Sequence, residues 1–159
     1  MKIKYIQHEV MNDAPFIGSL IVANDCSRNC KGCFNQELRD IPSIEMDIFD
    51  ILKEVKSNPL NEGVILGGLE WSEQPFDMCL LAVACMMEKI PVIIYTSKVE
   101  GDFLKIKYIQ KIFDYSIKSN CDLYVKYGCY DESNLCENNI QFGVKLATSN
   151  QYIKFYGGD

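Results

Sequence analysis

Apolar, β-branched runs alternate with amphipathic segments along this 159-residue chain. The runs predict strands over residues 16–23, 63–66, 91–95 and 122–126. Helical periodicity predicts helices over residues 43–57, 75–89 and 102–116. Repeated strand–helix units favour a parallel sheet with right-handed crossovers. About four or five units are too few for a closed eight-stranded barrel. We therefore expect an α/β fold, a partial, open (β/α) barrel of mostly parallel strands with helices on the outside, in one domain over residues 1–159.

Local signals predict the ends and faces of these elements. Ser43 is a candidate N-cap of the first helix, with acidic residues in the following turn. The apolar faces expected for the three helices are Ile48, Ile51, Leu52 and Val55; Phe76, Cys79, Leu80, Val83 and Met87; and Leu104, Tyr108, Ile112 and Tyr115. Polar residues 131–139 form the longest expected loop, and strand-like pieces at 142–146 and 152–156 follow it.

Composition excludes several classes of function. The net charge is −6 and the isoelectric point about 4.8, so phosphate backbones repel the chain and nucleic acid is not an expected ligand. No apolar stretch approaches the roughly 20 residues that a membrane helix needs, so no membrane association is expected. Eight cysteines are too sparse for a small secreted disulfide framework, and no signal peptide is evident. We expect a cytoplasmic protein whose reduced cysteines bind metal or take part in catalysis.

Three cysteines, Cys26, Cys30 and Cys33, follow the first strand with the spacing C-x3-C-x2-C. Four-iron clusters are usually held by four cysteines and structural zinc by four ligands, so three thiolates on one loop leave a coordination position open. A zinc knuckle needs another ligand nearby, but the single histidine, His8, lies 18 residues before the motif and the next cysteine is Cys79. The pattern therefore favours a reactive iron–sulfur cluster over zinc or free thiols. Cys79, on the apolar face of its helix, is expected to pack in the core.

Other chemically suggestive residues also follow strands. Gly67, Gly68 and Glu70 follow the second strand, and Thr96 and Ser97 follow the third. Parallel strands end at a common edge, where α/β proteins carry their sites, so these residues are expected to meet the cysteine loop. Glycine lets a ligand approach the backbone closely, although it also serves in tight turns.

The cysteine motif resembles that of the radical S-adenosylmethionine superfamily. Within the superfamily, the loop Cys30-Lys31-Gly32-Cys33-Phe34-Asn35, the strand end Tyr95-Thr96 and the tail segments 122–128 and 147–151 look most like the activating protein of anaerobic (class III) ribonucleotide reductase. The resemblance runs from about residue 5 to 156. The tail segments are imperfect versions of the family pattern, and Gly67-Gly68-Leu69-Glu70 departs from the Gly-Gly-Glu-Pro element of the radical enzymes.

The resemblance implies one radical S-adenosylmethionine domain with two cofactors, a 4Fe–4S cluster and S-adenosyl-L-methionine. The implied cluster ligands are Cys26, Cys30 and Cys33. The implied cosubstrate-binding residues are Gly67, Gly68, Glu70, Thr96, Ser97 and Phe34. Either the glycine backbone or the Glu70 side chain would bind the amino group. Thr96 and Ser97 would bind ribose and carboxylate, or else form an exposed turn, and Phe34 would pack on adenine, or else belong to the core.

The implied activity is that of an oxidoreductase that activates a glycyl-radical enzyme. Reductive cleavage of S-adenosylmethionine would give a 5′-deoxyadenosyl radical that takes hydrogen from a glycine of anaerobic ribonucleotide reductase. The implied partners are this protein substrate and a one-electron donor such as flavodoxin or ferredoxin. Two alternatives stay open. One is another radical enzyme, either the activase of a different glycyl-radical enzyme or a small-molecule enzyme such as 7-carboxy-7-deazaguanine synthase. The other is a non-enzymatic iron–sulfur or zinc module with a fourth protein ligand.

Replacing a motif cysteine is expected to prevent cluster formation. Cys26→Ala, Cys30→Ala or Cys33→Ala each removes one thiolate, so anaerobic reconstitution should yield protein without the visible absorbance of a thiolate-bound cluster. Cys79→Ala is the control and should keep that absorbance. Loss of the absorbance in the control would contradict the three-ligand assignment.

Overall fold

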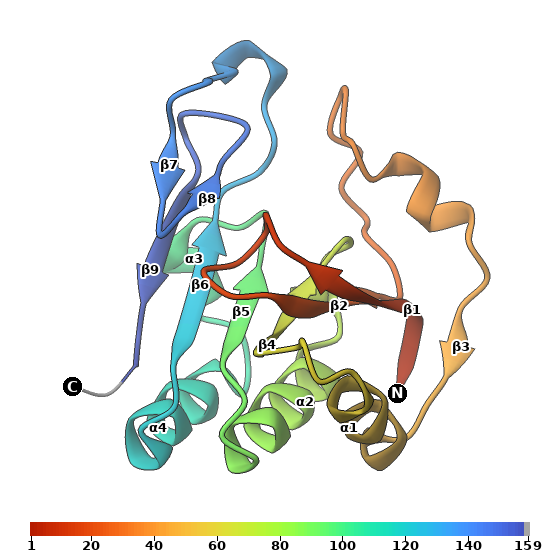
Figure 1. Cartoon of the computed structure of the whole chain (residues 1–159). Coiled ribbons are helices and arrows are strands. Elements are labelled where there is room, and N and C mark those ends of the chain that lie inside the picture. The colour runs from red at the N-terminus through yellow and green to blue at the C-terminus, as the bar shows by residue number, and fades with distance from the viewer. Residues whose placement is uncertain (158–159) are drawn as a thin grey trace.

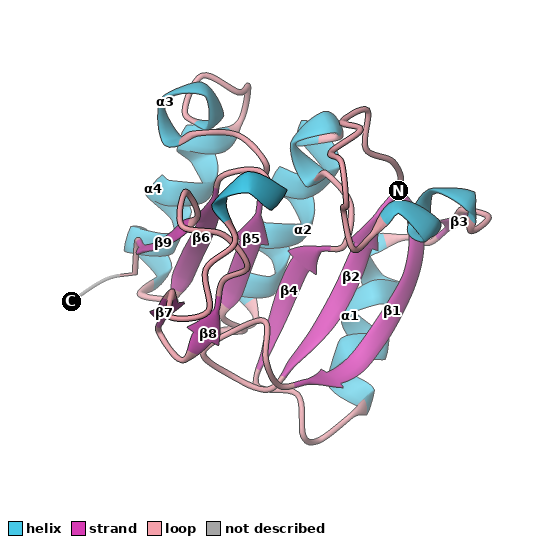
Figure 2. Cartoon of the chain, turned by 90° about the horizontal axis from the view of Figure 1, so that it is seen from above, coloured by secondary structure: helices cyan, strands magenta, loops and turns pink. Residues whose placement is uncertain are grey.

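The computed structural model describes residues 1–157 and contains a seven-stranded sheet in the order β3-β1-β2-β4-β5-β6-β9 (Figures 1 and 2). These strands are β1 (Lys2–Val10), β2 (Gly18–Ala23), β3 (Ile44–Glu45), β4 (Gly63–Gly67), β5 (Val92–Tyr95), β6 (Leu123–Tyr127) and β9 (Tyr152–Phe155). The central strands β2, β4, β5 and β6 run parallel, whereas β1, β3 and β9 pair antiparallel with their neighbours. The predicted α/β class and the mostly parallel sheet are confirmed.

The two faces of the sheet are covered differently. The helices α1 (Ile48–Ser57), α2 (Pro75–Met87) and α4 (Ile109–Ser119) lie together on one face (Figures 1 and 2). The opposite face carries a smaller apolar cluster, which includes Ile65, Ile93 and Val144. It is covered by the 11–17 loop and the hairpin β7 (Ile140–Gln141)–β8 (Val144–Lys145). Much of the second face is therefore left for loops and a cavity.

The start of the first helix differs from the prediction. Residues Ile44 and Glu45 pair with β1 as the short strand β3, so Ser43 does not cap a helix. Asp47 is the N-cap instead, and its side chain accepts a hydrogen bond from the Asp50 amide at 2.9 Å. Ile51 and Val55 are buried as expected. The register with β1, a long-range contact, outweighed the local capping signal.

The buried face of α2 is not the one predicted. Its buried side chains are Met78, Leu81, Ala82, Cys85 and Met86. Of the predicted face, Phe76 is 60% exposed, Leu80 41% and Met87 64%, while Cys79 is half-buried rather than in the core. Because α2 is apolar around most of its circumference, periodicity alone does not determine which side meets the sheet.

The third predicted helix is divided into α3 (Glu100–Phe103) and α4. Tyr108 adopts a left-handed backbone conformation with φ of 76° immediately before α4, which interrupts the helix. Phe103, Ile109 and Ile112 face the core, whereas Leu104 is 46% exposed. The predicted stripe was therefore only partly correct.

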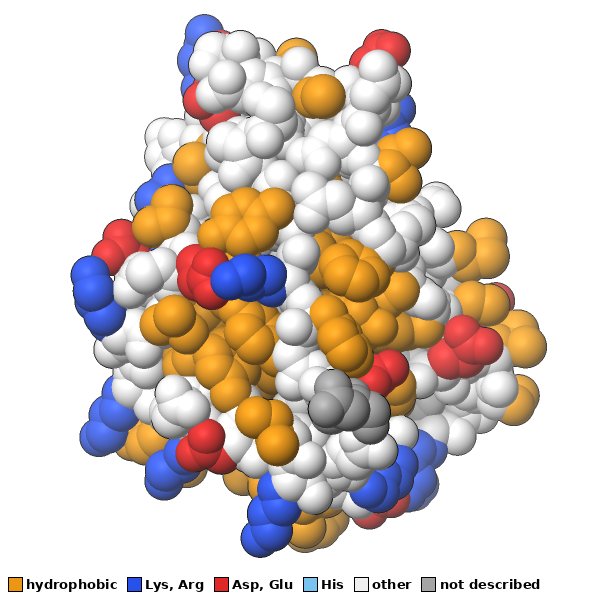
Figure 3. All heavy atoms as spheres, turned by 90° about the vertical axis from the view of Figure 1, so that its left-hand side faces the viewer, with side chains coloured by type: hydrophobic (Ala, Val, Ile, Leu, Met, Phe, Trp, Pro, Cys, Tyr) orange, Lys and Arg blue, Asp and Glu red, His pale blue; other side chains and the backbone are white. Residues whose placement is uncertain are grey.

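The two ends of the chain complete the edges of the sheet. Strand β1, which was not among the predicted strands, pairs with β2 through irregular register shifts. The piece predicted at 152–156 is β9, an edge strand, and the piece predicted at 142–146 belongs to the β7–β8 hairpin. Hydrophobic side chains form a broad patch on the face that carries β9 (Figure 3), where the rings of Phe142 and Phe155 contact Tyr124. Within residues 1–157, no helix is both long enough and apolar enough to cross a membrane.

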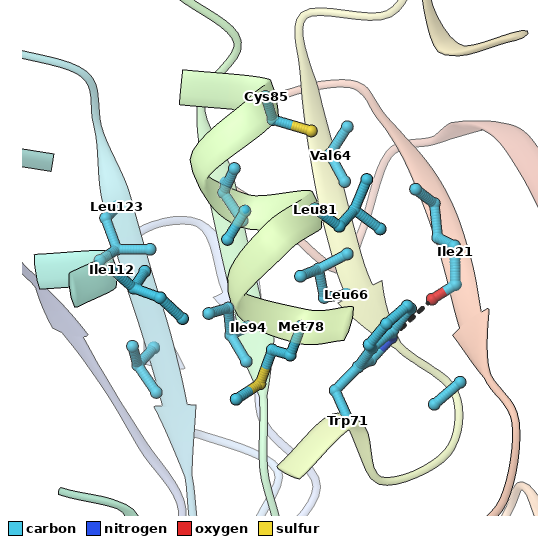
Figure 4. Close-up of a cluster of buried hydrophobic side chains, with 14 of the residues drawn as sticks. Ile21, Val64, Leu66, Trp71, Met78, Leu81, Cys85, Ile94, Ile112 and Leu123 are labelled. Atoms are coloured by element: carbon cyan, nitrogen blue, oxygen red, sulfur yellow. Dashed lines mark hydrogen bonds between the residues drawn. The ribbon is translucent and has the colours of Figure 1, made fainter. Parts of the chain in front are cut away.

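The main core lies between the sheet and the helices, and Trp71 is its largest fully buried side chain. Trp71 lies in the short 3-10 helix η2 (Trp71–Glu73), beside Met78 and Leu81 (Figure 4). Its indole Nε1–H donates a hydrogen bond to the Ile21 carbonyl at 2.9 Å. The segment that follows β4 is thus joined to β2, the strand that leads into the cysteine loop.

Trp71→Phe is expected to lower the free energy of unfolding by about 1–3 kcal/mol, because it removes the donor for a buried carbonyl. Urea unfolding followed by circular dichroism measures the change. Phe49→Ala, at a site that is 78% exposed, is the control and should change the free energy of unfolding by less than about 0.5 kcal/mol. Equal effects of the two changes would contradict the structural role of the indole.

Candidate active-site cavity

A cavity of about 500 Å³ opens where the parallel strands end. Its floor comes from the sheet face opposite the helices, with Leu20, Ile65 and Tyr95, and its rim comes from the loops. All nine predicted site residues line it: Cys26, Cys30, Cys33, Phe34, Gly67, Gly68, Glu70, Thr96 and Ser97. The common edge of the parallel strands brings these distant segments together, as expected.

The cysteine loop is attached to the segment that follows β4. The Asp25 carbonyl accepts a hydrogen bond from the Glu70 amide at 3.1 Å. The Ser27 amide and hydroxyl both donate to the Glu73 carboxylate, the hydroxyl at 2.7 Å. Farther along, the buried Lys4 ammonium donates to the Arg39 carbonyl at 3.1 Å. Both ends of the loop are therefore anchored, and the three cysteines lie between the anchors.

The three motif thiols are half-buried and free. The Cys26 thiol donates to the Arg28 carbonyl at 3.8 Å, and the Cys33 sulfur accepts from the Asn35 amide at 3.4 Å. Burial raises the pKa of Cys26, and the nearby Glu70 and Glu73 carboxylates act in the same direction. In the described part of the chain, no three His, Cys, Asp or Glu side chains are arranged to hold a metal ion. Metal binding would therefore require Cys26 to lose its proton.

Glu70 joins the ends of β4 and β5. The residue is 5% exposed, and its carboxylate accepts a hydrogen bond from the Ser72 amide at 3.2 Å. The Thr96 hydroxyl donates to it at 2.9 Å, and the Ser97 amide and hydroxyl donate at 2.7 and 2.5 Å. These four hydrogen bonds occupy the acceptor capacity of the carboxylate. The side chain of Glu70 therefore holds the rim of the cavity together. The alternative that Thr96 and Ser97 form a turn with exposed hydroxyls is wrong, because both hydroxyls donate to Glu70.

Gly67 and Gly68 line the cavity, and close packing around them also explains why glycine occurs at these positions. Gly68 has φ of +76°, and a Cβ there would lie 2.8 Å from a methyl group of Val22. A Cβ on Gly67 would lie 3.3 Å from Leu20. A side chain at residue 68 would therefore strain the backbone and clash. The turn that exposes this backbone to the cavity requires glycine at residue 68.

The cysteine loop also meets the loop after β6. The Lys31 ammonium pairs with Glu132 at 2.6 Å, and the ring of Phe34 packs edge-on against Tyr130 with centroids 5.1 Å apart. Phe34 is 76% exposed, so the core alternative for this residue is wrong. The two loops border the cavity on opposite sides and touch at these contacts.

Lys126, Cys129 and Arg39 also line the cavity, although none of them is among the predicted site residues. Lys126 is 8% exposed, and its ammonium donates to the Gly128 carbonyl at 2.9 Å. Burial lowers its pKa to about 8, which Glu70, Cys129 and Cys30 partly oppose. Arg39 has a buried Nε without a hydrogen-bond partner among the described residues. A lysine at the end of an apolar parallel strand was the signal available for Lys126; Arg39 had none.

The donor set fits an iron–sulfur cluster. Three thiols from one loop line one cavity, and thiolates are the usual ligands of such clusters. Lys126 and the Arg39 guanidinium, whose Nε–H has no hydrogen-bond partner among residues 1–157, supply positive charge for an anionic group. His8 does not line this cavity; it contacts Ser19 and Glu54. No protein-family model and no curated protein matches the chain.

Lys126 is expected to make stability depend on pH. The unfolded chain keeps this proton up to about pH 10.5, whereas the folded chain releases it near pH 8. Between these values the unfolded state binds more protons, so the free energy of unfolding of wild type should rise with pH relative to that of Lys126→Met. Urea unfolding at pH 7, 8, 9 and 10 measures the difference. The exposed Lys53→Met is the control, and an unchanged difference across this range would contradict the assignment.

Proposed function

We propose that this chain is a radical S-adenosylmethionine enzyme built on a partial, open (β/α) barrel. Within that class, we propose the activating enzyme of an anaerobic ribonucleotide reductase. The observation that carries the proposal is that Cys26, Cys30 and Cys33 line the same cavity as Gly67 and Gly68. Three thiols and a glycine turn meet there although they follow different strands.

When bound, a 4Fe–4S cluster would supply the electron that splits S-adenosylmethionine into methionine and a 5′-deoxyadenosyl radical, which takes hydrogen from a glycine Cα of the reductase. The chain's own groups bind and orient. Lys126 places a cation in the cavity for an anionic group such as a carboxylate. Glu70 holds Thr96 and Ser97 at the rim, where their oxygens can still accept hydrogen bonds.

A polypeptide substrate suits the rim of this cavity. Its residues Phe34 and Arg28 are exposed, and the cysteine loop and the loop after β6 meet through surface contacts. Lys31 is 88% exposed in its ion pair with Glu132, so solvent screens that contact and it adds little stability. The loops can therefore part at small cost to admit an extended segment that carries a glycine. A cytoplasmic location and a flavodoxin- or ferredoxin-like donor accompany the proposal.

Anaerobic reconstitution with iron and sulfide, reduction with dithionite and addition of S-adenosylmethionine test the proposal. Chromatography should detect 5′-deoxyadenosine, and adding a candidate anaerobic ribonucleotide reductase should give a glycyl-radical signal in electron paramagnetic resonance. Cys30→Ala should give neither product. A fully loaded, reduced protein that leaves S-adenosylmethionine intact would overturn the radical-enzyme assignment.

Cys129 favours a second candidate, an iron–sulfur module with four protein ligands. It lines the cavity with the motif cysteines, and both Cys129 and Cys30 act electrostatically on Lys126. Four thiolates would fill all the coordination positions of a cluster and leave none open for a cosubstrate. Cys129→Ala distinguishes the candidates, because the radical enzyme keeps its cluster in this variant and the four-thiolate module loses it.

A further inference from the structure

The proposed reaction consumes one electron per cleavage, so the chain needs a protein that delivers it. A groove of about 310 Å³ lies between α2 and α4, on the helix side of the sheet. Its lining shares no residue with the active-site cavity. The residues that line it are Phe76, Cys79, Leu80, Val83, Tyr108, Lys111 and Tyr115. This is the side of α2 that its sequence suggests is core.

The apolar groove carries positive charge on its rim. The ammonium groups of Lys107 and Lys111 lie 4.9 and 5.6 Å from the centre of the Tyr108 ring. Neither lysine forms an ion pair among residues 1–157, whereas Lys105 beside them is paired with Asp102. The rim of the groove therefore carries two positive charges although the chain as a whole has a net charge of −6. An apolar centre with a charged rim is the usual composition of a docking surface for a partner of opposite charge.

The backbone holds Tyr108 in place at a conformational cost. Its left-handed φ of 76° is unusual for an aromatic residue. In this conformation the Tyr108 ring packs edge-on against Phe76, with centroids 5.7 Å apart, across the groove. Strain of this kind concentrates at binding sites and switches.

The groove is connected to the cysteine loop through a short segment. Phe76 lies in the first turn of α2, three residues after Glu73. The Glu73 carboxylate accepts from the Ser27 amide at 3.0 Å, and Ser27 adjoins Cys26. A partner that binds the groove near Phe76, at the N-terminal end of α2, therefore approaches the cysteine loop from the helix side of the sheet. The cavity stays open to the protein substrate on the other face.

We propose that this groove docks an acidic one-electron carrier protein, which inserts an apolar side chain between Phe76 and Leu80 and pairs its carboxylates with Lys107 and Lys111. The inference rests on the proposed function. In the transfer, the carrier's reduced cofactor would lose one electron and a cluster held by Cys26, Cys30 and Cys33 would gain it, with no bond made or broken. Because attraction between opposite charges speeds encounter, binding should weaken as salt rises.

Titration calorimetry with a recombinant, acidic flavodoxin as the probe tests the docking on the chain without its cluster. The double variant Lys107→Glu, Lys111→Glu should bind at least tenfold more weakly than wild type at low salt, and Leu80→Asp should also weaken binding. Lys2→Glu, Lys53→Glu is the matched control, since it changes the net charge equally at exposed sites that do not line the groove. Circular dichroism establishes that each variant is folded.

Reduction of the loaded protein gives a second measurement. Photoreduced flavodoxin should reduce the groove variant at least tenfold more slowly than wild type, whereas dithionite, which needs no docking, should reduce both equally. No binding of the probe to wild type, an equal loss in the control, or a wild-type dimer that the groove variant breaks would each overturn the proposal. If dithionite-reduced wild type fails to cleave S-adenosylmethionine, the proposed function fails, and calorimetry still decides whether an acidic protein docks.

Discussion

The buried carboxylate of Glu70 is the interaction on which the site depends. It accepts four hydrogen bonds from Ser72, Thr96 and Ser97, so the segments after β4 and β5 are held to one group. The Glu70 amide donates to Asp25, which brings in the cysteine loop. A buried carboxylate is costly unless its oxygens are hydrogen-bonded, and here the rim of the cavity supplies the donors. The same contacts that stabilise the charge therefore assemble the cavity.

The sheet divides the molecule into a structural face and a chemical face. Alternate residues of the parallel strands point to opposite sides, so Val64 and Leu66 enter the helix-side core while Ile65 faces the smaller cluster and the cavity. The helices α1, α2 and α4 cover the first side (Figure 1). On the second side, the β7–β8 hairpin and the 11–17 loop cover part of the strands, which leaves room where the strands end. The cavity follows from this incomplete cover.

The helix side of the molecule also exposes apolar side chains to solvent. The α2 helix is apolar on the side that meets the sheet and also on the side that meets solvent, where Phe76 and Leu80 are exposed. The break before α4 places Tyr108 opposite this second side. A helix buried on one face needs only one apolar stripe. The second stripe is therefore the feature that connects the core packing of this protein with the proposed docking of a partner.

The sequence by itself determined the elements that depend on local pattern. Alternating strands and helices indicated the parallel sheet, and the strand ends placed all nine predicted residues on one cavity, because parallel strands end at a common edge. Only the tertiary structure decided which side of α2 is buried, that β3 replaces the predicted cap at Ser43, and that Arg39 joins the site. These features depend on contacts between residues far apart in the chain. An apolar helix, a two-residue strand and Arg39, which follows none of the predicted strands, carry no local signal of the neighbour that each will meet.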